Sequence, residues 1–201
     1  MKIRHALSVF ALCALMPFAP AVGGTHAPLW LDDADALATV INNDGAEIGQ
    51  AYVKQGTEGV LLYIAVHSLP SGALGLHFHE VGDCSDHDAF MEAGGHIMPS
   101  GKPHGFLHPE GPHEGNLPNL IVHDDGTARV EMYTQLVHVT DGDAALLGGN
   151  GATLMIHEHV DDHYSQPIGN AGGRIGCGVF VAPGADKPHH HGHHHDQDYS
   201  R

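Results

Sequence analysis

The chain has 201 residues, which suit one domain with a sizeable core. Its 24 acidic residues against 8 lysines and arginines exclude partners that require a basic face, such as nucleic acid or an anionic membrane surface. The 27 glycines, 12 prolines and 6% aromatic residues indicate short strands joined by turns, so we expect an all-β sandwich or barrel. The 21 histidines exceed any structural need, and because imidazole is the commonest ligand of zinc and copper they indicate metal binding.

Residues 1–21 are predicted to be a secretory signal peptide. Lys2 and Arg4 precede an apolar run from Ala6 to Met16 that is too short to cross a bilayer, and small residues stand before a cleavage point after Ala21. Cleavage there would remove one of the three cysteines and leave two in an oxidising compartment, where we expect them to form one disulfide. The sequence therefore predicts a periplasmic or secreted protein.

A domain is predicted over residues 38–183, after a linker over 22–37. Apolar alternation and turn residues predict eight strands, at 38–42, 47–54, 59–67, 76–79, 120–123, 128–133, 152–157 and 177–181. The stretches between residues 79 and 120 and from 158 to 176 show no usable periodicity. Long loops inside a compact domain are usually functional, so we expect these two to carry the chemistry.

The C-terminal residues 184–201 are predicted to form a disordered metal-binding tail. Residues 189–195 are all histidine except Gly192, a composition that favours capture of copper or zinc. A purification tag is the alternative interpretation. The interruption at Gly192 and the six residues that follow the run favour a natural tail.

Within the predicted domain, His77 and His79 stand two residues apart on a predicted strand. Both imidazoles therefore project from the same face and can bind one ion. Such a pair alone is weak support, because two histidines on a solvated strand face are about as common.

Further motifs follow this pair in a specific order and spacing. They are Gly75-Leu-His-Phe-His-Glu-Val-Gly-Asp-Cys84, Gly94-Gly-His96, His104-Gly, Gly111-Pro-His113-Glu-Gly-Asn116, Ile156-His157-Glu-His-Val-Asp161 and Gly169-Asn-Ala-Gly-Gly-Arg174-Ile-Gly-Cys177. From Ala38 to Val181 the chain resembles the copper/zinc superoxide dismutase family, in the form typical of exported bacterial enzymes.

This resemblance implies an eight-stranded Greek-key β-barrel and an enzyme that dismutates the superoxide anion to oxygen and hydrogen peroxide. It makes four histidines ligands of a redox-cycling copper, namely His77, His79, His96 and His157. It makes His96 the bridge to a zinc ion that His104 and His113 also bind, and His96 would take a proton on reduction of copper and pass it to peroxide.

Further residues take their roles from the same resemblance. Asp161 matches a carboxylate that hydrogen-bonds ligands of both metals, a role that ligating histidines also require on physical grounds. Cys84 and Cys177 match the intrachain disulfide, and Arg174 matches the arginine beside the copper that receives superoxide.

Asn116 departs from the pattern, because the family has an aspartate zinc ligand there. An amide oxygen is a neutral and weaker donor than a carboxylate, so we expect reduced zinc affinity or another fourth ligand, with His108 as the substitute. The remaining histidines of the domain, His87, His123, His138, His159 and His163 among them, are expected at the surface.

A periplasmic copper/zinc-binding or storage protein on a dismutase-like domain is the alternative function, which Asn116 and the histidine-rich tail both permit. The complete copper set and Arg174 favour the enzyme. The sequence leaves open whether the chain forms a homodimer.

Overall fold

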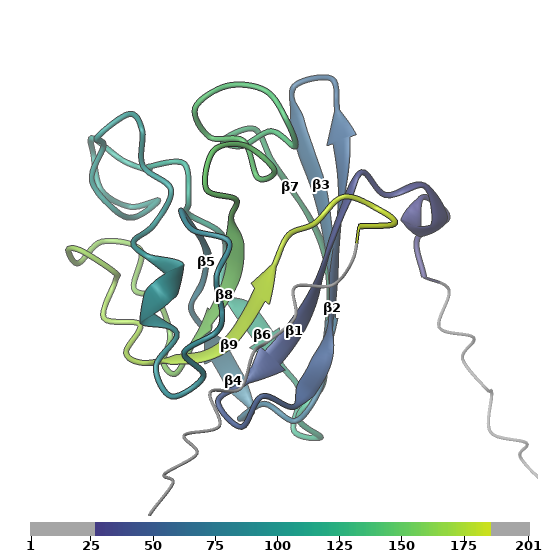
Figure 1. Cartoon of the computed structure of the whole chain (residues 1–201). Coiled ribbons are helices and arrows are strands. Elements are labelled where there is room, and N and C mark those ends of the chain that lie inside the picture. Colours follow the sequence, from purple (N-terminus) through teal and green to yellow (C-terminus); the bar gives the residue numbers. More distant parts are fainter. Residues whose placement is uncertain (1–26, 186–201) are drawn as a thin grey trace, which may run out of the picture.

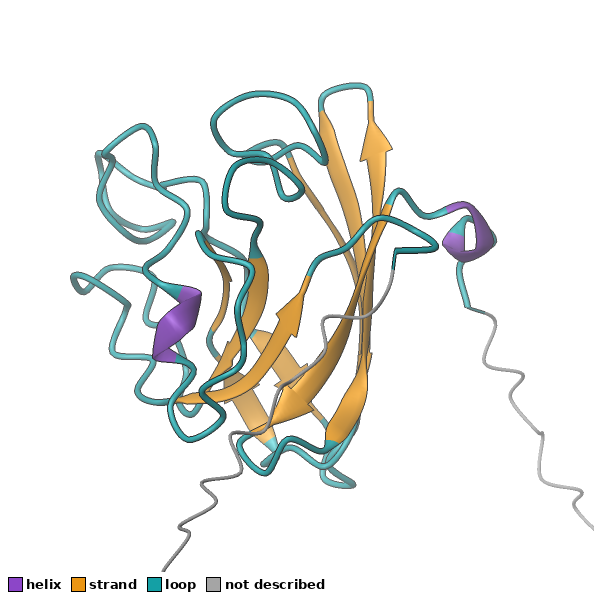
Figure 2. Cartoon of the chain, in the orientation of Figure 1, coloured by secondary structure: helices purple, strands orange, loops and turns teal. Residues whose placement is uncertain are grey.

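The computed structural model describes residues 27–185, and the predicted signal peptide and the histidine run of the tail lie outside this range. The described chain is almost entirely strand and loop (Figure 2), so the predicted all-β fold is confirmed. The strands are β1 Ala36–Asn42, β2 Glu47–Gly56, β3 Gly59–Val66, β4 Gly72–Leu74, β5 Leu76–His79, β6 Leu120–Val122, β7 Ala128–Thr134, β8 Thr153–His157 and β9 Arg174–Val179. All eight predicted strands are present, whereas β4 was not predicted.

Seven of these strands form one antiparallel sheet in the order β5-β8-β9-β1-β2-β3-β7, and β4 pairs with β6. The large sheet curls, so that β5 and β8 at one end lie across the core from β2 and β3 (Figure 1). Alternation decides which residues face inward: in β3, Leu62 and Ile64 are buried in the core, while Tyr63 between them packs against Tyr52 of β2 on the outer face.

Gly59 shows how tightly the turn between β2 and β3 packs. Its φ is +136°, and a Cβ at this position would lie 2.2 Å from the carbonyl oxygen of Thr134 on the neighbouring strand. Only glycine fits such a position, so this residue secures the start of β3 beside β7.

Two long loops lie together on one side of the sheet, beside β5 and β8 (Figure 1). The first, residues 80–119, joins β5 to β6 and contains the short 3-10 helix η2, Met91–Ala93; the second, residues 158–173, joins β8 to β9. The other 3-10 helix, η1 at Leu31–Asp33, precedes β1. No helix in residues 27–185 is long and apolar enough to cross a membrane.

The predicted disulfide is confirmed, because Cys84 and Cys177 are bonded. It joins the first loop to β9 across a sequence separation of 93 residues. Both cysteines are buried and pack with Ile41, Phe90 and Met155 in a small apolar cluster beside the main core.

Candidate metal centre

Four histidines from three parts of the chain form what we call the first group. His77 and His79 lie on β5, His157 ends β8, and His96 comes from the first loop. β5 pairs with β8, and an isolated bridge joins His79 to His96, so backbone hydrogen bonding brings these segments side by side. One nitrogen from each ring lies within 4.8 Å of the others, and all four side chains are buried.

One nitrogen of each ring in the first group is held by a protein partner. Nε2 of His77 lies 2.8 Å from the Asp161 carboxylate, and Nδ1 of His79 lies 3.0 Å from the carbonyl of Gly94. Nδ1 of His157 lies 3.3 Å from the carbonyl of Gly172. Such bonds fix the orientation and tautomer of a ring whose other nitrogen binds a metal.

The other nitrogen of each ring has no partner in the described chain. The unpaired atoms are Nδ1 of His77 and Nε2 of His79, His96 and His157. Leaving several buried acceptors unsatisfied is unfavourable, and one metal ion would satisfy all four together. The first group therefore fits a metal ion with imidazole ligands.

The buried rings are held in the neutral form that a metal requires. Burial, together with charge on His77, lowers the pKa of His157 to about 3. Burial and the nearby Arg174 lower the pKa of His79 well below its usual value, and burial likewise lowers those of His77 and His96. At neutral pH these nitrogens therefore present lone pairs.

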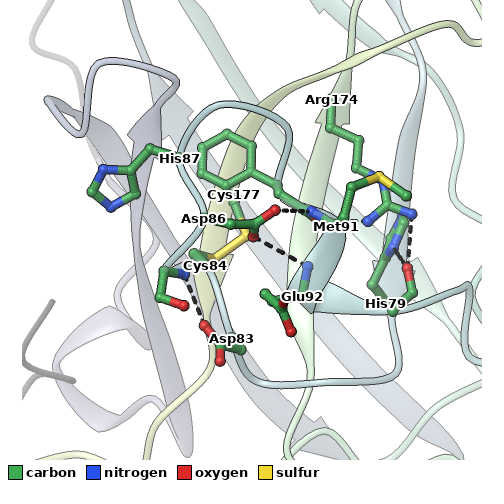
Figure 3. The surroundings of a disulfide bond; sticks show 12 residues. His79, Asp83, Cys84, Asp86, His87, Met91, Glu92, Arg174 and Cys177 are labelled. Atoms are coloured by element: carbon green, nitrogen blue, oxygen red, sulfur yellow. Dashed lines mark hydrogen bonds between the residues drawn. A yellow bond between two sulfur atoms is a disulfide. The ribbon is translucent and has the colours of Figure 1, made fainter. Parts of the chain in front are cut away.

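Arg174 begins β9, and its side chain lies beside His79 of the first group (Figure 3). Its guanidinium donates to the carbonyl oxygens of Phe90 at 2.5 Å and Gly94 at 2.7 Å, and the same Gly94 carbonyl holds His79. Burial lowers the pKa of Arg174, while the nearby Asp86 carboxylate opposes that shift. Arg174 and His79 thereby share the carbonyl of Gly94.

A surface pocket of about 490 Å³ leads to this region. Its lining includes His157, Arg174, Met91 and Glu158. The pocket borders His157 of the first group, with Arg174 as a cationic side chain at its wall.

Three histidines, His96, His104 and His113, form a second group whose ring nitrogens also lie within 4.8 Å of one another. All three are buried, and burial together with His104 lowers the pKa of His113 to about 4. His96 belongs to both groups, so the rings form one continuous cluster.

Asp161 joins the two groups. One carboxylate oxygen lies 2.8 Å from Nε2 of His77, and the other lies 3.0 Å from Nε2 of His104. Burial alone would raise the pKa of this carboxyl, but the hydrogen bonds from His104 and His77 outweigh burial and hold the pKa well below its usual value. Asp161 is therefore an anion that orients one ring of each group.

Asn116 is fully buried beside His104, where the resemblance expects an aspartate. Its amide nitrogen lies 3.1 Å from Nδ1 of His104, and its amide oxygen accepts a hydrogen bond from the backbone N–H of Gly105 at 3.2 Å. The residue thus presents N–H groups to the second group, not an oxygen ligand.

His108 belongs to neither group in the described chain. Its ring packs against Tyr164, with centroids 5.6 Å apart, and its Nδ1 accepts the backbone N–H of Glu110. The structure does not place it as a substitute ligand.

Two polar residues at the site were missed by sequence reasoning. Asn119 accepts the backbone N–H of Asp161 at 2.8 Å and donates to the carbonyl of Asp161 at 2.9 Å, so it fixes the backbone that carries this carboxylate. His163, expected at the surface, donates its backbone N–H to Asp161 and packs against Phe106. No spacing or motif marks either residue, because each acts through loop packing.

Comparison with known proteins places most of the chain in one family. The profile of the copper/zinc superoxide dismutase family matches residues 47–180. Superoxide dismutase (Cu-Zn) 2 of Aquifex aeolicus is 42% identical over 150 residues, which cover 74% of this chain and 87% of that protein. Superoxide dismutase (Cu-Zn) of Caulobacter vibrioides is 40% identical over 148 residues, covering 72% and 84%. The crystal structure of a superoxide dismutase-like protein from Bacillus subtilis matches with a TM-score of 0.69 and 35% identity, covering 72% of this chain and 97% of that one.

Proposed function

Since the chain belongs to the copper/zinc superoxide dismutase family, we propose that it dismutates superoxide at a copper ion held by the first group of histidines. The observation that carries this proposal is the set of buried, unpaired nitrogens on His77, His79, His96 and His157. They converge on one point, and imidazole ligands suit copper. The protein is accordingly an oxidoreductase.

When bound, copper supplies the one-electron redox change, in which one superoxide is oxidised to oxygen and a second, taking up two protons, is reduced to hydrogen peroxide. The residues of the chain supply the binding of the anion and a position for a proton. They also keep the ligand nitrogens in place, through the hydrogen bonds to Asp161, Gly94 and Gly172.

Arg174 is the residue proposed to bind superoxide. A guanidinium offers five N–H donors. In Arg174, one N–H of Nη1 donates to the carbonyl of Phe90 and one N–H of Nη2 donates to the carbonyl of Gly94. Those bonds fix the fork at the pocket wall, and the remaining donors can hold the anion. Local attraction matters because the chain as a whole is acidic, with a formal net charge of −16.

His96 is the residue proposed to hold a proton for peroxide. Its Nε2 is unpaired and faces the first group, while its Nδ1 lies 3.0 Å from Nε2 of His113. A proton held at Nε2 would lie inside the group and could pass to the reduced oxygen species.

The family resemblance also places zinc on the second group, bridged to copper through His96. His96, His104 and His113 are residues of the type that binds zinc, but Asn116 does not supply the fourth, anionic ligand. The proposed reaction therefore depends on the first group alone.

An activity gel on the full chain reconstituted with copper, with and without zinc, tests this function. We expect activity in the copper-loaded wild type and in His159→Ala, because His159 is exposed, and none in His157→Ala. Absence of activity in the wild type under both metal conditions would support the alternative, a copper/zinc-binding or storage protein.

We also propose that the protein is exported to the periplasm or secreted, with residues 1–21 removed and a metal-capturing tail over residues 184–201. The Cys84–Cys177 disulfide supports this, because disulfides persist in oxidising compartments. Deleting residues 186–201 should lower activity only when metal is scarce, and an equal loss in copper-replete medium would contradict a capturing role.

A further inference from the structure

The second group differs from the first in how its nitrogens are used. All four metal-facing nitrogens of the first group lack partners, whereas in the second group only Nδ1 of His113 does. Nδ1 of His104 is bonded to Asn116, and Nδ1 of His96 is bonded to the ring of His113. Hydrogen bonds thus occupy Nδ1 of His104 and Nδ1 of His96, the two nitrogens that a metal ion at the second group would need.

The orientation of the Asn116 amide is determined by the backbone. Its oxygen accepts the N–H of Gly105, and turning the amide over would place its NH2 group against that N–H, donor against donor. Asn116 is fully buried, so water cannot relieve such a contact. The amide nitrogen must therefore face His104.

The tautomer of His104 leads to the same conclusion from the other side of the ring. The Asp161 carboxylate requires a proton on Nε2 of His104, which leaves Nδ1 as an acceptor. That acceptor receives the N–H of Asn116. The lone pair that would bind a metal is therefore already in use, and the bonds run without conflict from Asn116 through His104 and Asp161 to the first-group ligand His77.

A metal ion at the second group would have to break this arrangement. It would displace the Asn116 N–H from His104, and it could gain the amide oxygen only by opposing the Gly105 N–H. No carboxylate would face the ion in return, because the two oxygens of Asp161 are already directed at Nε2 of His104 and of His77.

We propose that Asn116 is a specificity-determining residue that closes the second group to zinc and keeps it as a metal-free hydrogen-bonded cluster, so that copper acts alone. This inference rests on the proposed function, since it concerns the metal requirement of the same reaction. The hydrogen bonds from Asn116 through His104 and Asp161 then fix the orientation of the His77 ring. A second metal ion bound to His104 would otherwise have this role.

Nuclear magnetic resonance of the full-length, metal-free protein labelled with nitrogen-15 tests the hydrogen bonds directly. We expect His104 to carry a proton on Nε2 and to accept a hydrogen bond at Nδ1, and once copper(I) has filled the first group we expect one further equivalent of zinc to leave that signal unchanged. A His104 signal that shifts in proportion to the added zinc would overturn the proposal. This measurement needs no substitution at Asn116.

Cobalt(II), added to the full chain after copper(I) has filled the first group, serves as a probe of the second group, because four-coordinate cobalt absorbs visible light far more strongly than the six-coordinate ion expected on exposed histidines. We expect only weak absorption in the wild type. Asn116→Asp should produce the strong band and raise cobalt affinity at least about tenfold, the effect of losing one competing hydrogen bond and gaining an anionic ligand. Asn150→Asp adds the same charge at an exposed position and should behave as the wild type.

Activity of the wild type loaded with copper alone completes the test. We expect it to lie within about twofold of the activity with copper and zinc together, and a tenfold or greater requirement for zinc would refute the inference. A chain that is inactive with both metal loadings would refute the proposed function instead. The tautomer and the cobalt spectrum would still decide the role of Asn116.

Discussion

Asp161 holds His77, a proposed copper ligand, by a hydrogen bond to Nε2 of its ring, and Asp161→Asn tests this role with almost no change in shape. One carboxylate oxygen accepts from His104 and from the backbone of His163, and the other accepts from His77. The amide of the variant will keep its oxygen on the side with two donors. Its NH2 group will then face Nε2 of His77, which must give up its proton.

The displaced proton has one other place on the ring, Nδ1, which is the unpaired nitrogen that faces the first group. Copper would have to remove it. We therefore expect copper affinity to fall about 10- to 100-fold, the usual range for loss of a hydrogen bond behind a ligand. Loss of a buried hydrogen bond to a charged acceptor should also reduce the free energy of unfolding of the metal-free protein by roughly 1.5–3 kcal/mol.

Competition with a copper chelator measures the first effect, and urea unfolding of the metal-free protein measures the second. Asp162→Asn is the matched control, since Asp162 is the exposed neighbour and also accepts backbone N–H groups. Both variants carry the same histidine-rich tail, so their difference reports the folded site. If Asp161→Asn competes for copper as well as Asp162→Asn does, the reasoning about His77 is wrong.

Three further predictions follow from the site and its surroundings. Arg174→Glu should lower kcat/KM by about tenfold or more and reverse its dependence on salt, because the cation proposed to attract superoxide becomes an anion. Pulse radiolysis at several salt concentrations measures both, and an unchanged rate and salt dependence would remove Arg174 from the reaction. Cys84→Ser should lower the free energy of unfolding by roughly 4 kcal/mol in urea, since the disulfide closes a loop of 93 residues; a loss below about 1 kcal/mol would contradict the chain-entropy account. The metal-free protein should lose stability as the pH falls from 7 to 5, because the unfolded chain takes up protons near pH 6.5 whereas His157 in the folded chain does so only near its pKa of about 3. His157 alone should contribute about 2 kcal/mol of that loss. Urea unfolding at each pH checks the direction, and stability that rises toward pH 5 would show that these rings are not neutral when folded.

Local pattern was enough to predict most of the fold. Alternation along residues 47–54 and 59–67 predicted β2 and β3, because successive side chains of a strand face opposite sides of the sheet. The same period placed His77 and His79 on one face. β4, Gly72–Leu74, was not predicted.

Residue types and their spacing predicted the part of the site that consists of side chains in recognisable motifs. The motifs around His96, His157 and Arg174 indicated a copper site by family resemblance, and the structure brings the four first-group histidines together. The cysteine count indicated one disulfide, which the structure contains. The carbonyls of Gly94 and Gly172 could not be foreseen, because backbone acceptors leave no mark in a sequence.

The sequence by itself determined an all-β chain and the two long loops, and through family resemblance it indicated the four histidines of the first group. It also identified Asn116 as a departure, but it left open whether the amide oxygen or another residue such as His108 would face the second group. Only the tertiary structure decided this, because the answer depends on the Gly105 N–H, the Asp161 carboxylate and hydrogen bonds between residues of the two loops that are more than 40 positions apart in the sequence. Such contacts arise from packing between loops, which local sequence patterns do not encode.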